Sequence, residues 1–217
     1  HGPPRHRATQ VTAAPGGLRD NARMSAFDDD TRVTRLGDDP EGTDATAAFN
    51  GQVQPSWNIG NNPNGGYLLA LAAQALRQHT PEQPDPLSLT AHYLRPGLAG
   101  QPCRIDTQLL RRGRQLSTLR ATLSQDGGTR LELLAAMGDL GAAHAAPPAR
   151  LTLPRPELPL PDECLARSAP AQGVGLPILD RLDVRLHPDE AHPGATGRAR
   201  VSGWIRFVDG REPDALA

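Results

Sequence analysis

The sequence contains no lysine, few aromatic residues and only two cysteines. All 23 basic residues are arginine and stand against 24 acidic residues, which leaves a formal net charge of −1. This balance gives no electrostatic reason to expect nucleic acid as a partner. The longest apolar run, residues 67–73, is far shorter than the ~20 residues that cross a bilayer, so we expect no membrane partner either.

Cysteine usage and the first residues indicate an ordinary cytoplasmic protein. Cys103 and Cys164 have no metal-ligand spacing, and two thiols make no disulfide framework, so we expect no metal and a reducing compartment. Residues 1–30 hold arginine, proline and glycine without the apolar core of a secretory signal. We interpret them as a disordered or extended leader, with a transit peptide or a natural start at Met24 as alternatives.

Glycine and proline are abundant, with 22 residues of each among 217. Together they stay below the ~25–30% that is typical of disordered chains. Hydrophobic residues make up 37%, which is adequate for a core, and the length predicts one or two domains. The sequence therefore excludes a wholly disordered chain.

One segment, residues 67–77, is rich in helix formers and apolar nearly all the way round, which predicts a helix buried on most faces. Asn62 suits its N-cap and Pro63 its first helical position. On both sides of this helix the apolar period changes to two, the strand signal. The resulting strands are expected at 45–53, 87–93, 105–109, 119–123 and 131–137, with a hairpin turn at 125–128.

An antiparallel sheet wrapped on one buried helix is an α+β domain, which we place at 31–140. Six prolines lie between positions 147 and 161, which predicts an extended, fairly stiff linker over 141–172. Strand patterns return at 178–186 and 199–208, before a turn that leads towards a helix. The segment 173–217 carries too few elements to bury a core of its own.

Several motifs, in this order and spacing, resemble the acyl-CoA thioesterase II-like, or double-hotdog, family. They are Asn64-Gly65-Gly66-Tyr67 at the apolar helix, SLTAHYLRPG at 88–97, and LRRGRQLSTLR at 110–120. Residues 203–213, GWIRFVDGREP, look like the opening of a second hotdog. The resemblance covers roughly residues 31–217 and implies a hotdog fold with one complete repeat and an incomplete second repeat, 173–217.

The resemblance also implies hydrolysis of fatty acyl-CoA thioesters by a water that a carboxylate orients. In the family this carboxylate, with a Thr or Ser and a Gln, comes from the second hotdog, so its position is expected beyond Ala217. The catalytic residue is therefore left unknown, because Asp214 stands too early to inherit the role. No cofactor is implied apart from the coenzyme A moiety of the substrate.

The motif residues supply candidates for substrate binding. Backbone N–H groups of Gly65 and Gly66 at a helix start can hold a thioester carbonyl oxygen, although a close helix–sheet contact is an equal alternative. Asn64 either caps the helix or contacts ligand, and Tyr67 is expected beside the acyl chain.

Three further candidates lie outside the helix. His92 is either a general base or a structural histidine. Arg112 and Arg114 either bind the phosphates of coenzyme A or form a solvated turn. The candidate substrate-binding residues are thus Asn64, Gly65, Gly66, Tyr67, His92, Arg112 and Arg114.

Two alternatives to an acyl-CoA thioesterase remain at this point. One is a catalytically inactive hotdog protein that binds acyl-CoA or serves in assembly, or a truncated fragment that lacks the catalytic carboxylate. A weaker one is a dehydratase, which would require a histidine and an acid at the helix start. Since an isolated hotdog exposes a sheet edge, we also expect a homodimer or a higher oligomer.

Overall fold

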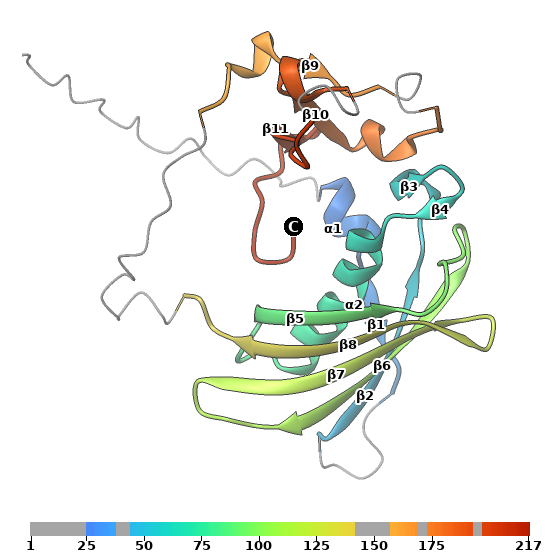
Figure 1. Ribbon diagram of the computed structural model, residues 1–217. Coiled ribbons are helices and arrows are strands. Elements are labelled where there is room, and N and C mark those ends of the chain that lie inside the picture. The colour runs from blue at the N-terminus through green and yellow to red at the C-terminus, as the bar shows by residue number, and fades with distance from the viewer. Residues whose placement is uncertain (1–24, 38–43, 142–156, 169–172, 193–196) are drawn as a thin grey trace, which may run out of the picture.

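The computed structural model describes residues 25–37, 44–141, 157–168, 173–192 and 197–217. They form a large antiparallel sheet with one long helix against it, and a smaller sheet on the other side of that helix (Figure 1). None of the described helices is long and apolar enough to cross a membrane.

The large sheet has six strands in the order β1-β2-β6-β7-β8-β5. Their bounds are β1 (Val33–Arg35), β2 (Thr46–Gln52), β5 (Asp85–Tyr93), β6 (Pro102–Arg111), β7 (Leu116–Gln125) and β8 (Gly128–Gly138). The turn between β7 and β8 places Asp126 and Gly127 at φ +48° and +66°, as the Asp-Gly pair predicts. The strands anticipated from the period of two are all present.

Helix α2 (Gly65–His79) packs across one face of this sheet. Most of its residues are buried, and Leu71 and Leu76 are fully so. They meet a core that the inward faces of the strands supply, with Phe49, Ile105 and Leu119 at 0% exposure. A sheet wrapped on a buried helix is the hotdog arrangement, so the predicted fold class is confirmed.

The predicted start of the helix is wrong by two residues. Asn62 and Pro63 form the short strand β4 (Asn62–Pro63), which pairs with β3 (Asn58–Ile59). The amide of Asn64 donates to Trp57 O at 3.0 Å, which holds this turn in place. Asn64 is the N-cap, since its Oδ1 accepts from Tyr67 N at 3.2 Å, and the helix begins at Gly65.

The interpretation of 1–30 as a leader is wrong for its last residues. Helix α1 (Ala26–Asp30) begins after Ser25, whose hydroxyl accepts from Asp28 N at 3.1 Å. Phe27 is 6% exposed because its ring lies against Trp57 and Phe207. Burial of this aromatic side chain, together with the hydrogen bond from Trp57 Nε1 to Asp30 at 2.9 Å, holds the short helix to the hotdog. Residues 1–24 lie outside the described residues.

The small sheet has the order β11-β10-β9 and consists of β9 (Leu165–Ala166), β10 (Leu182–Leu186) and β11 (Gly203–Phe207). Short 3-10 helices accompany it and β3: η1 (Pro55–Trp57), η3 (Pro161–Glu163), η4 (Pro177–Asp180) and η5 (Pro188–Glu190). The start of the strand expected at 178–186 is thus helical, because Pro177 opens a turn there.

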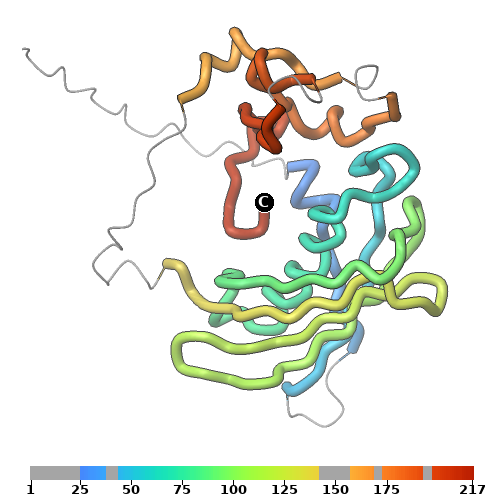
Figure 2. Tube along the Cα trace, viewed as in Figure 1, coloured from blue at the N-terminus to red at the C-terminus, as the bar shows by residue number. Residues whose placement is uncertain are grey.

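The predicted linker, 141–172, is not extended throughout. Its described part includes η3 and β9, and β9 pairs with β10, because Trp204 Nε1 donates to Pro159 O at 2.9 Å and draws this segment to the small sheet. Residues 142–156 and 169–172 lie outside the described residues. Beyond β11 the trace turns back beside α2 (Figure 2), and residues 208–217 are irregular, with turns at 208–209 and 215–216 and no helix among them.

Candidate functional site

A cavity of about 770 Å³ lies beside the first turns of α2. One wall is a side of that helix, with Gly66, Leu69, Ala70 and Ala73. The opposite wall consists of residues 210–213 and 215–217 and part of the small sheet. The apolar side chains in the lining include Phe27, Trp57, Tyr67, Leu89, Ile178, Leu182, Ile205, Phe207 and Leu216. The cavity is therefore suited to a hydrophobic chain.

The start of α2 presents backbone N–H groups next to this cavity. The first amides of a helix have no intrahelical acceptor. Asn64 takes up two of them, because its Oδ1 accepts from Tyr67 N and its carbonyl from Leu68 N at 3.2 Å. Within the described residues, the amides of Gly65 and Gly66 have no such acceptor. A carbonyl oxygen with developing negative charge fits that environment.

The two glycines face different surroundings. A Cβ on Gly65 would lie 3.2 Å from the ring of Tyr93, and Tyr93 OH donates to Gly65 O at 2.8 Å. Gly65 thus lies in a close contact between α2 and β5, beside a second hollow of about 350 Å³ that residues 93–97 also line. Gly66 is exposed and lines the large cavity.

Tyr67 lines the cavity with its ring, but its hydroxyl is used by the fold. The hydroxyl donates to Asp30 O at 2.7 Å, lies 3.1 Å from Gln52 O, and accepts from Gln54 N at 3.0 Å. Burial raises the pKa of Tyr67 well above its ordinary value. The ring stacks on Trp57, with centroids 5.4 Å apart. The Tyr67 hydroxyl is therefore a structural group.

His92 does not reach the cavity. It is exposed on β5 and pairs in register with Glu132 of β8. Its neighbours Ala91 and Tyr93 oppose the buried Leu133 and Leu131. Because side chains alternate along a strand, His92 points away from α2.

The arginines of the β6–β7 hairpin lie at the opposite end of α2. Gln83 donates to Gly113 O at 3.0 Å, and Arg112 forms ion pairs with Glu82 and Asp44. Arg114 is exposed in the same turn. Since α2 has 15 residues at ~1.5 Å each, its ends are about 20 Å apart. The structure thus gathers Asn64, Gly65, Gly66 and Tyr67, and separates His92, Arg112 and Arg114 from them.

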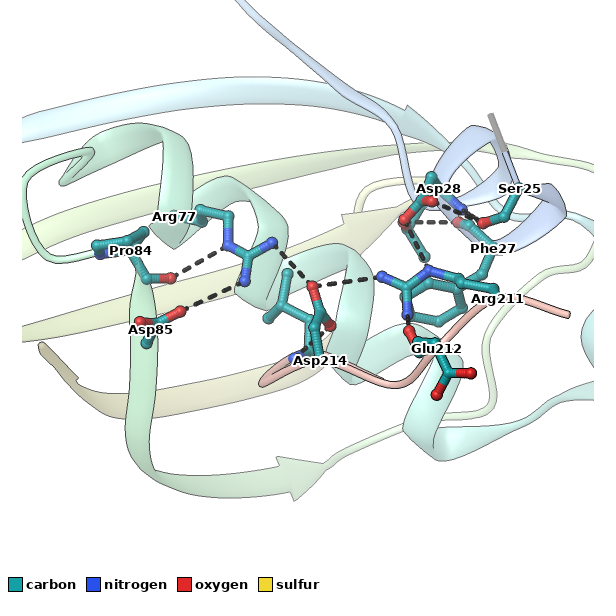
Figure 3. Close-up of polar contacts among 11 residues, drawn as sticks. Ser25, Phe27, Asp28, Arg77, Pro84, Asp85, Arg211, Glu212 and Asp214 are labelled. Carbon is teal, nitrogen blue, oxygen red and sulfur yellow. Dashed lines mark hydrogen bonds and ion pairs between the residues drawn. The ribbon is translucent and has the colours of Figure 1, made fainter. Parts of the chain in front are cut away.

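Sequence reasoning missed the charged residues that border the cavity. Arg211 pairs with Asp28 and Asp214, and Arg77 pairs with Asp214 and Asp85 (Figure 3). Burial acts to raise the pKa of Asp214, but the amide of Leu216 and the guanidinium groups of Arg211 and Arg77 outweigh it and lower this pKa. The run Asp209-Gly210-Arg211-Glu212-Pro213 stood out in the sequence, yet its partners lie up to 183 positions away.

The described part of the chain offers no group of three or more metal-ligating side chains placed to hold an ion.

Comparison with known proteins finds sequence and structural similarity to thioesterases. Residues 53–141 match the family described as "Acyl-CoA thioesterase N-terminal domain". Uncharacterized proteins of Mycobacterium tuberculosis and Mycobacterium bovis are 29% identical over 212 residues, which cover 89% of this chain and 72% of theirs.

Solved structures agree with the family match. A proposed thioesterase II from Thermobifida fusca is 28% identical with a TM-score of 0.66, over 87% of this chain and 65% of that one. The tesB protein of Mycobacterium avium subs. paratuberculosis is 25% identical with a TM-score of 0.60, over 87% and 62%. A hot dog protein of unknown function from Alicyclobacillus acidocaldarius shares the fold, at 24% identity and a TM-score of 0.68, over 86% and 64%.

The chain thus spans less than two thirds of each of these three solved proteins. The segment that matches the family, residues 53–141, contains the buried helix α2 and strands β5 to β8 of the six-stranded sheet. This protein is a thioesterase-like member of the hotdog superfamily, and its residues 53–141 match the acyl-CoA thioesterase N-terminal domain.

Proposed function

We propose that this protein acts on fatty acyl-CoA thioesters, with the acyl chain in the cavity beside α2. The observation that carries the proposal is the position of Gly66, which lines an apolar cavity of about 770 Å³ at the point where α2 begins. An apolar surface that could hold an acyl chain thus lies next to a backbone amide that lacks an acceptor, which supports the proposal. Volumes of this size are ordinary for small-molecule sites.

The proposed reaction is hydrolysis. Water adds to the thioester carbonyl carbon, negative charge develops on the oxygen, and the C–S bond breaks as the oxygen charge returns. The products are the fatty acid and coenzyme A, whose sulfur takes up a proton. Amides of Gly65 and Gly66 stabilise the oxygen through direct N–H donation and the positive end of the helix.

No catalytic acid is assigned among the described residues. Asp214 lies near the cavity, but its carboxylate binds two arginines and its pKa is lowered, which makes it a poor general base. Glu212 lines the cavity and is exposed.

The second candidate function is acyl-CoA binding without hydrolysis. The engagement of Asp28 and Asp214 by Arg211 favours it, because carboxylates held in ion pairs are not free to activate water. Ligands for the coenzyme A phosphates are left open, since Arg112 is paired at the far end of α2. A cytoplasmic role in fatty acid metabolism is part of this proposal.

The test offers a panel of acyl-CoAs to the 217-residue chain with a thiol reagent. We expect thiol release that falls about tenfold or more in Gly66→Ala, because the methyl group enters the carbonyl site and meets Asn64 Oδ1 at 3.0 Å. Gly175→Ala is the matched control, as its Cβ would meet nothing within 4 Å.

The two candidate functions give different results. Background release together with saturable binding of dodecyl-CoA thioether, a ligand that cannot be hydrolysed, supports the binding protein. Neither release nor binding contradicts both candidates.

A further inference from the structure

Five charged side chains from four parts of the chain form one continuous line beside the cavity (Figure 3). Arg211 Nε lies 3.0 Å from Asp28 of α1, and Arg211 Nη2 lies 3.3 Å from Asp214. Asp214 also lies 3.4 Å from Arg77 of α2, which in turn lies 3.6 Å from Asp85 of β5. Signs alternate along the line, so each inner charge has an opposite charge on both sides.

Arg211 is the least exposed member of this line, with 11% of its side chain accessible. Its Nη1 donates to Glu212 O at 3.0 Å, so every guanidinium nitrogen has a partner. The guanidinium also lies over the ring of Phe27, 4.8 Å from its centroid, and 5.4 Å from that of Phe207. The carboxylates of Asp28 and Asp214 are 44% and 40% exposed, so it is the burial of the guanidinium and the planar, multi-donor shape of arginine that fix the direction of these pairs.

The segment 209–217 depends on such side-chain contacts for its position. Its described backbone–backbone hydrogen bonds are local, from Gly210 N to Phe207 O and from Ala217 N to Asp214 O. What joins it to the hotdog is the Arg211 and Asp214 pairs and the carboxylate of Asp209, which accepts from Ala26 N at 2.9 Å. Residues 210–213 and 215–217 are also the cavity wall that faces α2.

We propose that Arg211 is a positioning residue that sets the width of the cavity. It holds the 209–217 segment against α1 and, through Asp214 and Arg77, against α2. Rigid placement of that wall limits the length of acyl chain that the cavity accepts. That an acyl chain fills the cavity rests on the proposed function. That Arg211 holds the 209–217 segment in place rests on the contacts alone.

The test combines hydrogen exchange with ligand binding. Arg211→Met keeps an apolar side chain over Phe27 and removes the charge, whereas Arg211→Lys keeps the charge but lacks the planar guanidinium group that binds several acceptors. Asp28→Asn weakens the same link while leaving Arg211 in place. Arg104→Met is the matched control, because Arg104 also forms an ion pair with an aspartate, Asp106, and lies outside the lining of this cavity. Binding is measured with butyl-CoA and dodecyl-CoA thioethers, which cannot be hydrolysed.

We expect amide exchange of residues 209–217 to rise about tenfold in Arg211→Met, the change that a loss of one charge-assisted contact produces. The preference between the two chain lengths should shrink by a similar factor. Asp28→Asn should act in the same direction, Arg211→Lys should recover part of both effects, and Arg104→Met should leave both within twofold of wild type.

The proposal is overturned if Arg211→Met leaves exchange in 209–217 unchanged, or if Arg104→Met has an equal effect. If the binding of both thioethers weakens equally, with no change in the preference between them, Arg211 has only a general structural role, and this result also overturns the proposal. If the wild type binds neither thioether, the proposed function fails, while the exchange result still decides whether Arg211 fastens the segment.

Discussion

Single residues of the site divide into those that serve the fold and those that face the cavity. Tyr67 and Asn64 belong to the motif at the start of α2, yet their side-chain polar atoms form hydrogen bonds with backbone groups of the fold. Gly66, which has no side chain, lines the cavity with its backbone. The chemistry at the start of α2 therefore belongs to backbone amides, and the side chains around them keep those amides in place.

Tyr67→Phe should destabilise the protein by about 1–3 kcal/mol, because it leaves buried partners of the hydroxyl without a hydrogen bond. Urea unfolding measures this loss. Tyr93→Phe is the comparison, since its half-exposed hydroxyl makes one bond, to Gly65 O, and should cost less. Unchanged stability in Tyr67→Phe together with lost ligand binding would show that the hydroxyl serves the substrate instead.

Asp214 should make stability depend on acid pH. Its folded pKa is lowered, so its contribution is fully present above the ordinary aspartate pKa of ~3.9 and is lost as pH falls through the folded value. Unfolding free energies of wild type and Asp214→Asn should differ at pH 7 and converge towards pH 3. Glu157→Gln, at an exposed site, controls for the loss of a negative charge. A difference that grows in acid would contradict the assignment.

At the level of elements, periodicity predicts the buried helix and five of the six described strands of the large sheet, because each buries one consistent face. It does not predict the three-residue strand β1. Its failures are local. Asn62-Pro63 has the composition of a helix start, but pairing with β3 decides its structure. Helix α1 is five residues long and is stabilised by the contact of Phe27 with Phe207, 180 positions away. No local pattern contains such a contact, and the same holds for the partners of Arg211.

The corrected helix start is testable by capping. Asn64→Ala should lose about 1 kcal/mol of stability, since the Tyr67 amide would lose its acceptor, and Asn64→Asp should retain most of it. Asn62→Ala, at an exposed strand position, should change stability little. Thermal or urea unfolding of the three variants gives the comparison. A larger loss in Asn62→Ala would return the cap to residue 62.

At the level of the whole molecule, the sheet has an open side. Strand β5 pairs with β8 on one side and ends the described sheet on the other, and Leu87 and Tyr93 on it are 46% and 50% exposed. Edges of this kind pair readily with a second copy. The homo-oligomer expected from the sequence therefore stays a prediction, and we expect its copies to pair at the open edge of β5.

We expect light scattering to give a dimer or a higher oligomer, and Ala91→Pro to shift it towards monomer. Leu94 N donates to Arg130 O at 2.8 Å, and in an antiparallel ladder this register directs the Ala91 amide to the open side. Proline there removes an edge donor without breaking a bond to β8. A wild-type monomer with a folded circular dichroism spectrum would contradict the prediction, as would an Ala91→Pro oligomer of unchanged size.

The central claim is that the thioester carbonyl lies at the start of α2, with its acyl chain in the adjoining cavity. The most direct measurement is an NMR titration of the 217-residue chain with a ketone analogue of dodecanoyl-CoA that cannot be hydrolysed. The claim predicts saturable shifts of the Gly65 and Gly66 amides, with the Gly113 amide at the far end of α2 unmoved. Shifts confined to the 111–114 hairpin, or saturable binding that leaves Gly65 and Gly66 unchanged, would contradict it.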